Sequence, residues 1–262
     1  MNPRHGSGQR VDDGQFLIFV GIGLLAQLVD GALGMAYGLV SNATLLAMGL
    51  PPAMASATVH TAEVFTTGVS GASHAWFGNV RWKLFWQLAV PGAVGGMVGA
   101  YFLAMVPGET IRPFVNAYLL ILGTMVLLRA FGKRVSHHQV QHTGVLGFVA
   151  GLLDAIGGGG WGPLATSTLI ARGGGVRSTI GSVNAAEFVV TACVSATLVW
   201  HVGIGHWPIV LGLLTGGVIA APLAAWLVRH LPERAVMAAV GSLIVLISLG
   251  QLLQQLLSNR EL

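Results

Sequence analysis

The sequence predicts an all-α fold: a polytopic membrane helix bundle of about eight crossings, made of two internal repeats that each contain a glycine-broken helix. Three observations predict it: the apolar composition, a series of long apolar runs and two glycine-rich interruptions. Of the 262 residues, 54% are hydrophobic and only 8% are charged, whereas soluble domains carry about 25% charged residues. A soluble enzyme and a disordered chain are therefore excluded. Without a basic stripe to follow phosphates, nucleic-acid binding is excluded as well.

Uncharged apolar runs of about 20 residues predict membrane-spanning helices. The uncharged runs are Leu84–Val106, Pro113–Leu128, Pro208–Val228 and Ala235–Leu257, and Ala53–Phe77 and Ser178–Trp200 contain one acid each. Two other segments, Phe16–Leu50 and Thr143–Ala171, consist of short apolar runs around DGALGMAYG and DAIGGGGWGP. A run such as Phe16–Val29 is roughly 21 Å long as a helix, shorter than the ~30 Å hydrocarbon core. Each broken segment is therefore either one interrupted span or a hairpin of two short helices, and a re-entrant hairpin is a further option.

The distribution of basic residues predicts the orientation. With eight crossings and the N-terminus inside, eight of the 13 Lys and Arg residues lie on the cytoplasmic side. Because cytoplasmic loops are enriched in Lys and Arg, this arrangement predicts that both termini are cytoplasmic.

The chain contains an internal repeat. A shift of 124 positions superimposes Asp30 on Asp154 and Glu63 on Glu187 without a gap, and these four are the acids that lie within apolar segments. We expect a first membrane repeat over residues 16–131, a central cytoplasmic linker over 132–142 and a second membrane repeat over 143–257. Transporters are commonly built from such repeats, with the substrate site where the two broken segments meet.

The four repeated acids are the candidate proton-coupling residues. A carboxylate at the bilayer centre costs roughly 2.5–3.5 kcal/mol, so these acids should face a cavity, be protonated or have partners. Asp30 and Asp154 end the first short helices, where the helix dipole favours the neutral acid. The alternative is that each Asp accepts hydrogen bonds from backbone amides freed by the glycine break. Glu63 and Glu187 lie in the middle of helices, within stripes of polar side chains. The alternative is that these polar side chains only hold the helices together.

The second glycine break is the candidate anion site. Gly157–Gly160 permit backbone conformations closed to other residues, and Pro163 can begin the next short helix. The N–H groups of that helix N-terminus suit an anion. The candidate substrate-binding residues lie in or near the two breaks and on the polar stripes: Asn42, His60, Gly158, Gly159, Gly160, Trp161, Ser167, Thr168, Arg172, Arg177 and Asn184. For Arg172 and Arg177 the alternative is that they are ordinary loop arginines.

The repeated unit resembles the TauE/SafE family. The resemblance lies in the breaks LVDGALGMAYG and LLDAIGGGGWGP and in the acids of the next helices, HTAEVFTTGVSG and NAAEFVVTACVS. This family of sulfite and organosulfonate exporters is also called the toluene-sulfonate uptake permease group. The resemblance implies a multi-pass secondary carrier of the bacterial inner membrane for small sulfur-containing anions.

We therefore expect a secondary transporter that exports sulfite or organosulfonates. Its two halves should rock around a site at their interface, and transport should be coupled to protons. The alternative is an anion channel with a glycine-rich filter. No enzyme is expected, since nucleophile motifs such as Gly-x-Ser-x-Gly are absent. Neither a cofactor nor a metal is expected, because one His and one carboxylate do not make a metal site. The expected partners are a small anionic substrate, membrane lipid and, as an open option, a second copy in a homodimer.

Overall fold

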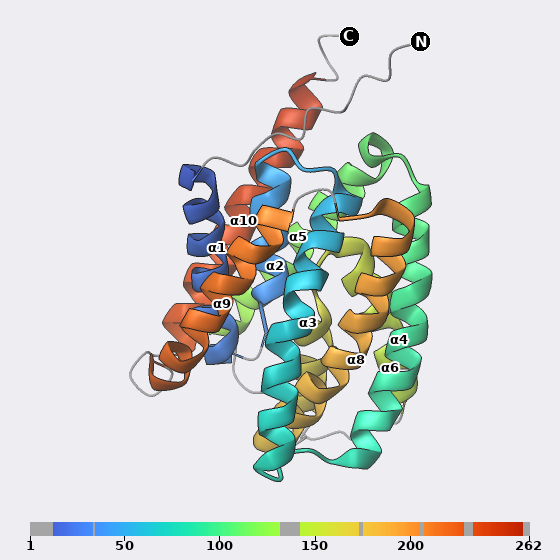
Figure 1. The fold of residues 1–262 in the computed structure, drawn as a ribbon, viewed down its shortest axis with the longest axis vertical. Helices are drawn as coiled ribbons and strands as arrows, with labels where there is room; N and C mark the ends of the chain where they lie inside the picture. Colours follow the sequence, from blue (N-terminus) through green and yellow to red (C-terminus); the bar gives the residue numbers. More distant parts are fainter. Residues whose placement is uncertain are drawn as a thin grey trace.

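The computed structural model describes residues 13–33, 35–131, 142–172, 175–204, 207–227 and 233–258. These residues form helices without a strand, so the predicted all-α fold is confirmed (Figure 1). The elements are α1 (Asp13–Leu33), α2 (Tyr37–Ala47), α3 (Pro52–Trp76), α4 (Trp82–Met105), α5 (Gly108–Phe131), α6 (Thr143–Gly157), the π-helix η1 (Gly162–Thr166), α7 (Ser167–Ala171), α8 (Val176–Val202), α9 (Trp207–Leu227) and α10 (Glu233–Ser258).

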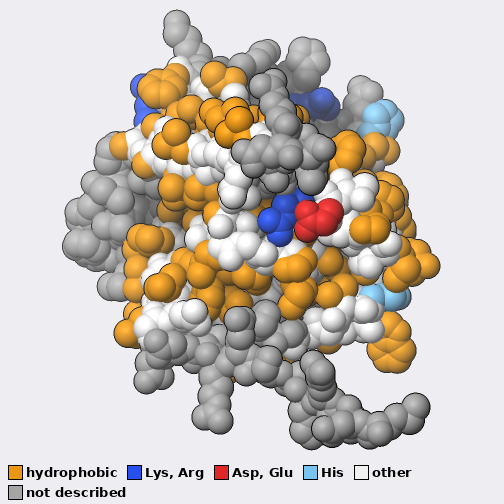
Figure 2. Space-filling model, turned by 90° about the horizontal axis from the view of Figure 1, so that it is seen from above, with side chains coloured by type: hydrophobic (Ala, Val, Ile, Leu, Met, Phe, Trp, Pro, Cys, Tyr) orange, Lys and Arg blue, Asp and Glu red, His pale blue; other side chains and the backbone are white. Residues whose placement is uncertain are grey.

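The bundle is that of a polytopic membrane protein. Among the described helices, four are long and apolar enough to cross a membrane: Trp82–Met105, Gly108–Phe131, Ser178–Val202 and Met237–Leu257. Helix α3 has 25 residues but carries a buried polar face. Seen from above, hydrophobic side chains cover much of the described part of the visible face (Figure 2). The repeat mates Trp76 and Trp200 are 88% and 85% exposed, as expected for aromatic residues at a membrane interface.

Each half of the chain packs against the other through glycines. Helix α4 lies along α6, where a Cβ on Gly151 would be 2.2 Å from the carbonyl oxygen of Gly92. Helix α1 lies along α9 in the same way, where a Cβ on Gly216 would be 2.0 Å from the carbonyl oxygen of Val20. Because small residues let helix backbones approach closely in membranes, these glycines bring the first half against the second.

Matched helices of the two halves run in opposite directions. In the α3–α8 pair, Thr61 faces Ser195 while Gly71, further along α3, faces Ala185, earlier in α8. In the α5–α10 pair, Gly123 faces Ile244, and Leu127, one turn on, faces the earlier Gly241. Both pairs are therefore antiparallel, although their members occupy corresponding places in the repeat. The halves form an inverted repeat.

This inversion bears on the number of crossings. Inverted halves need an odd number of crossings each, and the hairpin alternative for the broken segments meets this condition. Helix α1 begins at the end of the bundle where α10 finishes, and α2 returns towards that end, where Arg112 at the start of α5 donates hydrogen bonds to the carbonyls of Gly49 and Leu50 (Figure 1). The repeat boundaries stay a prediction, since residues 132–141 of the expected linker lie outside the described ranges.

Candidate functional site

Asp30 and Asp154, which are repeat mates, each bind the first backbone N–H groups of the short helix that follows the break. The backbone N–H of Tyr37 donates to Asp30 Oδ1 at 3.4 Å, and that of Trp161 donates to Asp154 Oδ1 at 2.8 Å. Tyr37 and Trp161 are themselves repeat mates, so both halves use the same contact over seven residues. The structure thus contains the alternative in which each Asp binds amides freed by the break, and both carboxylates complement the positive helix N-terminus.

The first glycine break joins α1 and α2 in one hairpin, and the second joins α6 and η1 in another. The tips of these two hairpins touch each other. A Cβ on Gly38 would lie 2.8 Å from the Cα of Gly159, and a Cβ on Gly159 would lie 2.4 Å from the carbonyl carbon of Gly38. Asn42 of α2 crosses the contact and donates its side-chain N–H to the carbonyl oxygen of Gly157. The glycine breaks, far apart in sequence, therefore meet inside the bundle.

A positive φ recurs at one matched position of the two breaks. Gly158, Gly159 and Gly160 have φ values of 67°, 155° and 147°. Ala36, the repeat mate of Gly160, has φ 147° as well, in a region that alanine rarely adopts. The two breaks therefore share this one backbone conformation, whereas Met35, the repeat mate of Gly159, does not adopt a positive φ.

The glutamates lie beside the joined tips. Glu63 is buried, accepts a hydrogen bond from the backbone N–H of Gly38, and its Oε1 lies 3.5 Å from a Cβ position on that glycine. Glu187 is partly buried and lies within electrostatic range of Glu63, Asp30 and Asp154. The four acids of the two halves thus gather around one place.

His60 links the two halves through Asp154. Its Nε2 lies 3.1 Å from Asp154 Oδ2, and its Nδ1 lies 2.9 Å from the carbonyl oxygen of Ser56. The hydroxyl of Ser56 donates to the carbonyl oxygen of Ala155 at 2.8 Å. Asn184, which replaces His60 in the repeat, donates to Ser70 Oγ at 3.1 Å instead. The contact between His60 and Asp154 therefore holds the second hairpin against α3. Among the described contacts, the first hairpin has no equivalent of it.

Trp161 is fully buried against α4 and α8. A Cβ on Gly92 would lie 2.7 Å from the Trp161 ring, and the indole N–H donates to the carbonyl oxygen of Val183 at 3.2 Å. The indole N–H is thus engaged within the protein, and the side chain wedges the second break between two helices.

The other predicted residues are more dispersed. Ser167 is buried and its hydroxyl contacts Met35 Sδ at 3.6 Å, while Thr168 is partly buried one residue further on. Arg172 is exposed and caps the far end of α7, roughly 15 Å of helix away from the break. The side chain of Arg177 lies outside the described part. The structure therefore does not bring Arg172 to the hairpin tips.

Tyr118 of α5 lies against the second break and is a candidate site residue that the sequence repeat did not indicate. Its ring edge lies 2.0 Å from a Cβ position on Gly157, and its hydroxyl oxygen lies 2.0 Å from one on Gly160. A sequence signal existed: Asn116 and Tyr118 interrupt an otherwise apolar run. The repeat comparison did not highlight Tyr118, because its mate in the second half is Ser242.

The site is acidic. Among the described residues, the buried polar side chains include Glu63, Asp154 and His60 but no Lys or Arg. Nor do the described residues hold a group of three or more His, Cys, Asp or Glu that could bind a metal. An inverted repeat with two discontinuous helices meeting beside intramembrane carboxyl groups defines the class of protein: a membrane transporter.

The comparisons with known proteins agree with this class. The family model described as "Sulfite exporter TauE/SafE" matches residues 19–250, and this chain belongs to that family. The chain is also 42% identical over 257 residues to "Probable membrane transporter protein YtnM" of Bacillus subtilis (strain 168), covering 94% of this chain and 85% of the relative. No solved structure matches the chain.

Proposed function

We propose that this transporter carries a small sulfur-containing oxyanion, such as sulfite or an organosulfonate, through the place where the hairpin tips meet. The observation that carries the proposal is the contact between Gly38 and Gly159 with four carboxyl groups gathered around it. Secondary transporters bind substrate at such a junction of discontinuous helices. The family description, which names sulfite, supports the choice of anion.

Proton coupling follows from the charge of the site. An anion that approaches Asp30, Glu63, Asp154 and Glu187 is repelled if these groups are ionised. Among the described residues no fully buried Lys or Arg compensates this charge, and the partly buried Arg129 donates to the carbonyl oxygen of Pro163. Protons on the carboxyl groups remove the repulsion, so anion and protons move together. The touching tips also favour a carrier over the channel alternative, since a Cβ-sized space between them is lacking.

The test is transport by purified protein in proteoliposomes. We expect saturable uptake of radiolabelled sulfite, counterflow from vesicles preloaded with sulfite, and a rate that depends on pH. Glu63→Gln combined with Glu187→Gln should flatten the pH profile, whereas the matched control Glu109→Gln, at an exposed position in the first turn of α5, should keep it. Ion currents that do not saturate would defeat the carrier, and an unchanged profile in the double variant would defeat the coupling.

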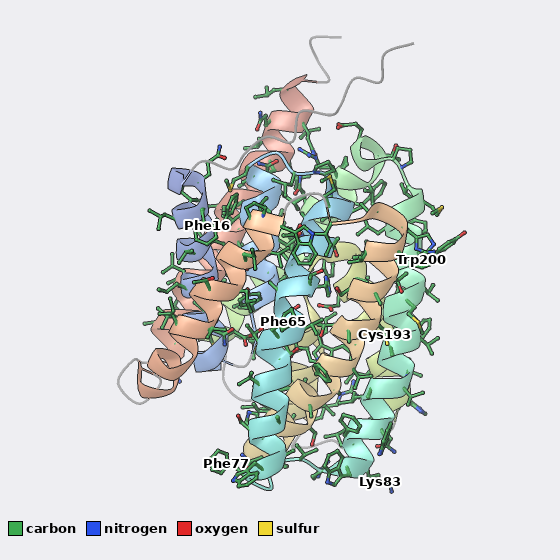
Figure 3. The ribbon with its side chains drawn as sticks, viewed as in Figure 1. Phe16, Phe65, Phe77, Lys83, Cys193 and Trp200 are labelled. Atoms are coloured by element: carbon green, nitrogen blue, oxygen red, sulfur yellow. The ribbon has the colours of Figure 1, made fainter. Side chains whose placement is uncertain are left out.

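We also propose a location and an orientation: the bacterial inner membrane, with both termini outside the cytoplasm. Lys83 lies at the end of the bundle remote from the start of α1 (Figure 3). The described basic residues of that end are Arg81, Lys83, Arg129, Arg172 and Arg234, whereas Arg112 belongs to the other end. Because positive charge favours the cytoplasmic side, inversion of the halves reverses the orientation expected from eight crossings. Surrounding lipid and a homodimer stay predictions.

A further inference from the structure

Two buried polar atoms beside the second glycine break have no partner within the described part of the chain. They are the hydroxyl oxygen of Tyr118 and the side-chain oxygen Oδ1 of Asn42. Asn42 is 1% exposed, and its N–H already donates to Gly157, which leaves Oδ1 as a free acceptor. Buried polar groups are almost always hydrogen-bonded, so these two atoms are free to bind a ligand.

The two atoms face the same short piece of backbone. The Tyr118 hydroxyl abuts Gly160, at 2.0 Å from its Cβ position, and Asn42 Oδ1 abuts Gly158, at 2.5 Å. The α-carbons of these glycines are two residues apart and hence within about 7 Å of each other. Both side chains fill the space beside these glycines, so a ligand reaches the pair when the hairpin tips separate during transport.

The chemistry of the pair is complementary. A tyrosine hydroxyl can donate a hydrogen bond, and an amide oxygen only accepts one. The ligand that satisfies both presents an acceptor oxygen to Tyr118 and an N–H or O–H to Asn42. The acidic surroundings, with no buried Lys or Arg among the described residues, also disfavour a dianion.

We propose that Tyr118 and Asn42 are the specificity-determining pair of the substrate site, and that they select a sulfur oxyanion of single charge that carries a hydrogen-bond donor. Hydrogensulfite and hydroxyl- or amino-substituted sulfonates belong to this class, whereas sulfate does not. This inference rests on the proposed function, since it refines the substrate of the same site. Tyr118 donates to an oxygen of the anion, and Asn42 Oδ1 accepts the hydrogen that the ligand carries.

The role of Tyr118 is tested with the purified full-length protein by calorimetric titration with sulfite. Tyr118→Phe should weaken binding about tenfold, the loss of one hydrogen bond, without lowering the thermal unfolding midpoint, because the hydroxyl has no partner in the protein to lose. Tyr101→Phe is the matched control, since Tyr101 is 54% exposed on α4. Unchanged affinity in Tyr118→Phe would overturn the inference.

The role of Asn42 is tested with two ligands of equal charge and similar size. Isethionate carries a hydroxyl group where propane-1-sulfonate carries a methyl group, so the unmodified protein should bind isethionate at least about tenfold tighter. In Asn42→Ala the two ligands should bind with equal affinity. A general loss of stability would not change the ratio of the two affinities, because both ligands are measured on the same protein. Equal affinities in the unmodified protein would overturn this inference alone, whereas failure of sulfite and both sulfonates to bind would overturn the proposed function with it.

Discussion

The hydroxyl oxygens of Thr67 and Thr191 lie 3.4 Å apart, and these two residues are repeat mates separated by 124 positions. A pseudo-twofold axis therefore passes between them, in the middle of the antiparallel α3–α8 pair. Glu63 and Glu187 each precede one of these threonines by one helical turn. Because the helices run in opposite directions, one glutamate lies on each side of the axis, which is the arrangement that alternating access requires.

The two aspartate caps should differ in strength. Asp154 accepts at 2.8 Å and also contacts His60, whereas Asp30 accepts from Tyr37 at 3.4 Å. We expect Asp154→Asn to lower the free energy of unfolding in detergent by about 1–3 kcal/mol, because a buried hydrogen-bonded pair is broken. Asp30→Asn should cost less. A larger loss in Asp30→Asn would contradict the asymmetry between the hairpins.

Contact of the hairpin tips should be sensitive to one methyl group. Gly38→Ala adds a Cβ only 2.8 Å from the Cα of Gly159, so the tips must separate and the transport rate should fall at least about tenfold. Gly21→Ala is the matched control, a helical glycine with no atom within 4 Å of its Cβ position. Initial rates in proteoliposomes compare the two, and equal rates would mean that the tips are not the site.

Ala36 and Gly160 share a φ of 147°, which suits glycine and strains alanine. Exchanging the two residue types should therefore change stability in opposite directions. Ala36→Gly should raise the thermal unfolding midpoint, because it relieves a positive φ that costs alanine about 1–2 kcal/mol. Gly160→Ala, at the repeat mate, should lower it, since the new Cβ both adopts that φ and meets the Tyr118 hydroxyl. A stabilising Gly160→Ala would show that the two breaks are not equivalent.

The orientation is testable with reporters fused to the C-terminus. Alkaline phosphatase folds only outside the cytoplasm and should be active there, while green fluorescent protein exported through the same route should stay dark. Reporters fused after Lys83 should behave in the opposite way, since that residue lies at the other end of the bundle (Figure 3). Cytoplasmic behaviour of the C-terminal fusion would restore the orientation expected from eight crossings.

Much of this architecture is predictable because acids in lipid are costly. The four acids stand out against an apolar background, and their equal spacing reveals the repeat and the broken segments. The direction of the second half is less accessible, because a repeated apolar pattern is the same in either direction. Only the loop charges carry that information, and 13 Lys and Arg residues spread over the chain carry little of it.

The candidate site was predictable where the repeat marks it. Gly158, Gly159 and Asn42 meet, but Arg172 does not reach them, since sequence proximity to the break was mistaken for spatial proximity. Tyr118 lay beyond such reasoning, because α5 contributes it without a repeat mate of the same kind. The groups that donate hydrogen bonds to each aspartate depend on where the backbone N–H groups point. The sequence does not specify that direction.

Alternating access requires that the two inverted halves, which face each other across Thr67 and Thr191, move relative to one another. The direct measurement is a reversible cross-link: Thr67→Cys with Thr191→Cys, in a chain whose Cys193 is replaced by serine. Mild oxidation should join the two cysteines within one chain, since their side chains lie in contact, and should stop sulfite transport until a reductant is added. Failure to cross-link would show that the two threonines do not face each other, and full transport by the cross-linked protein would show that the halves do not move apart there.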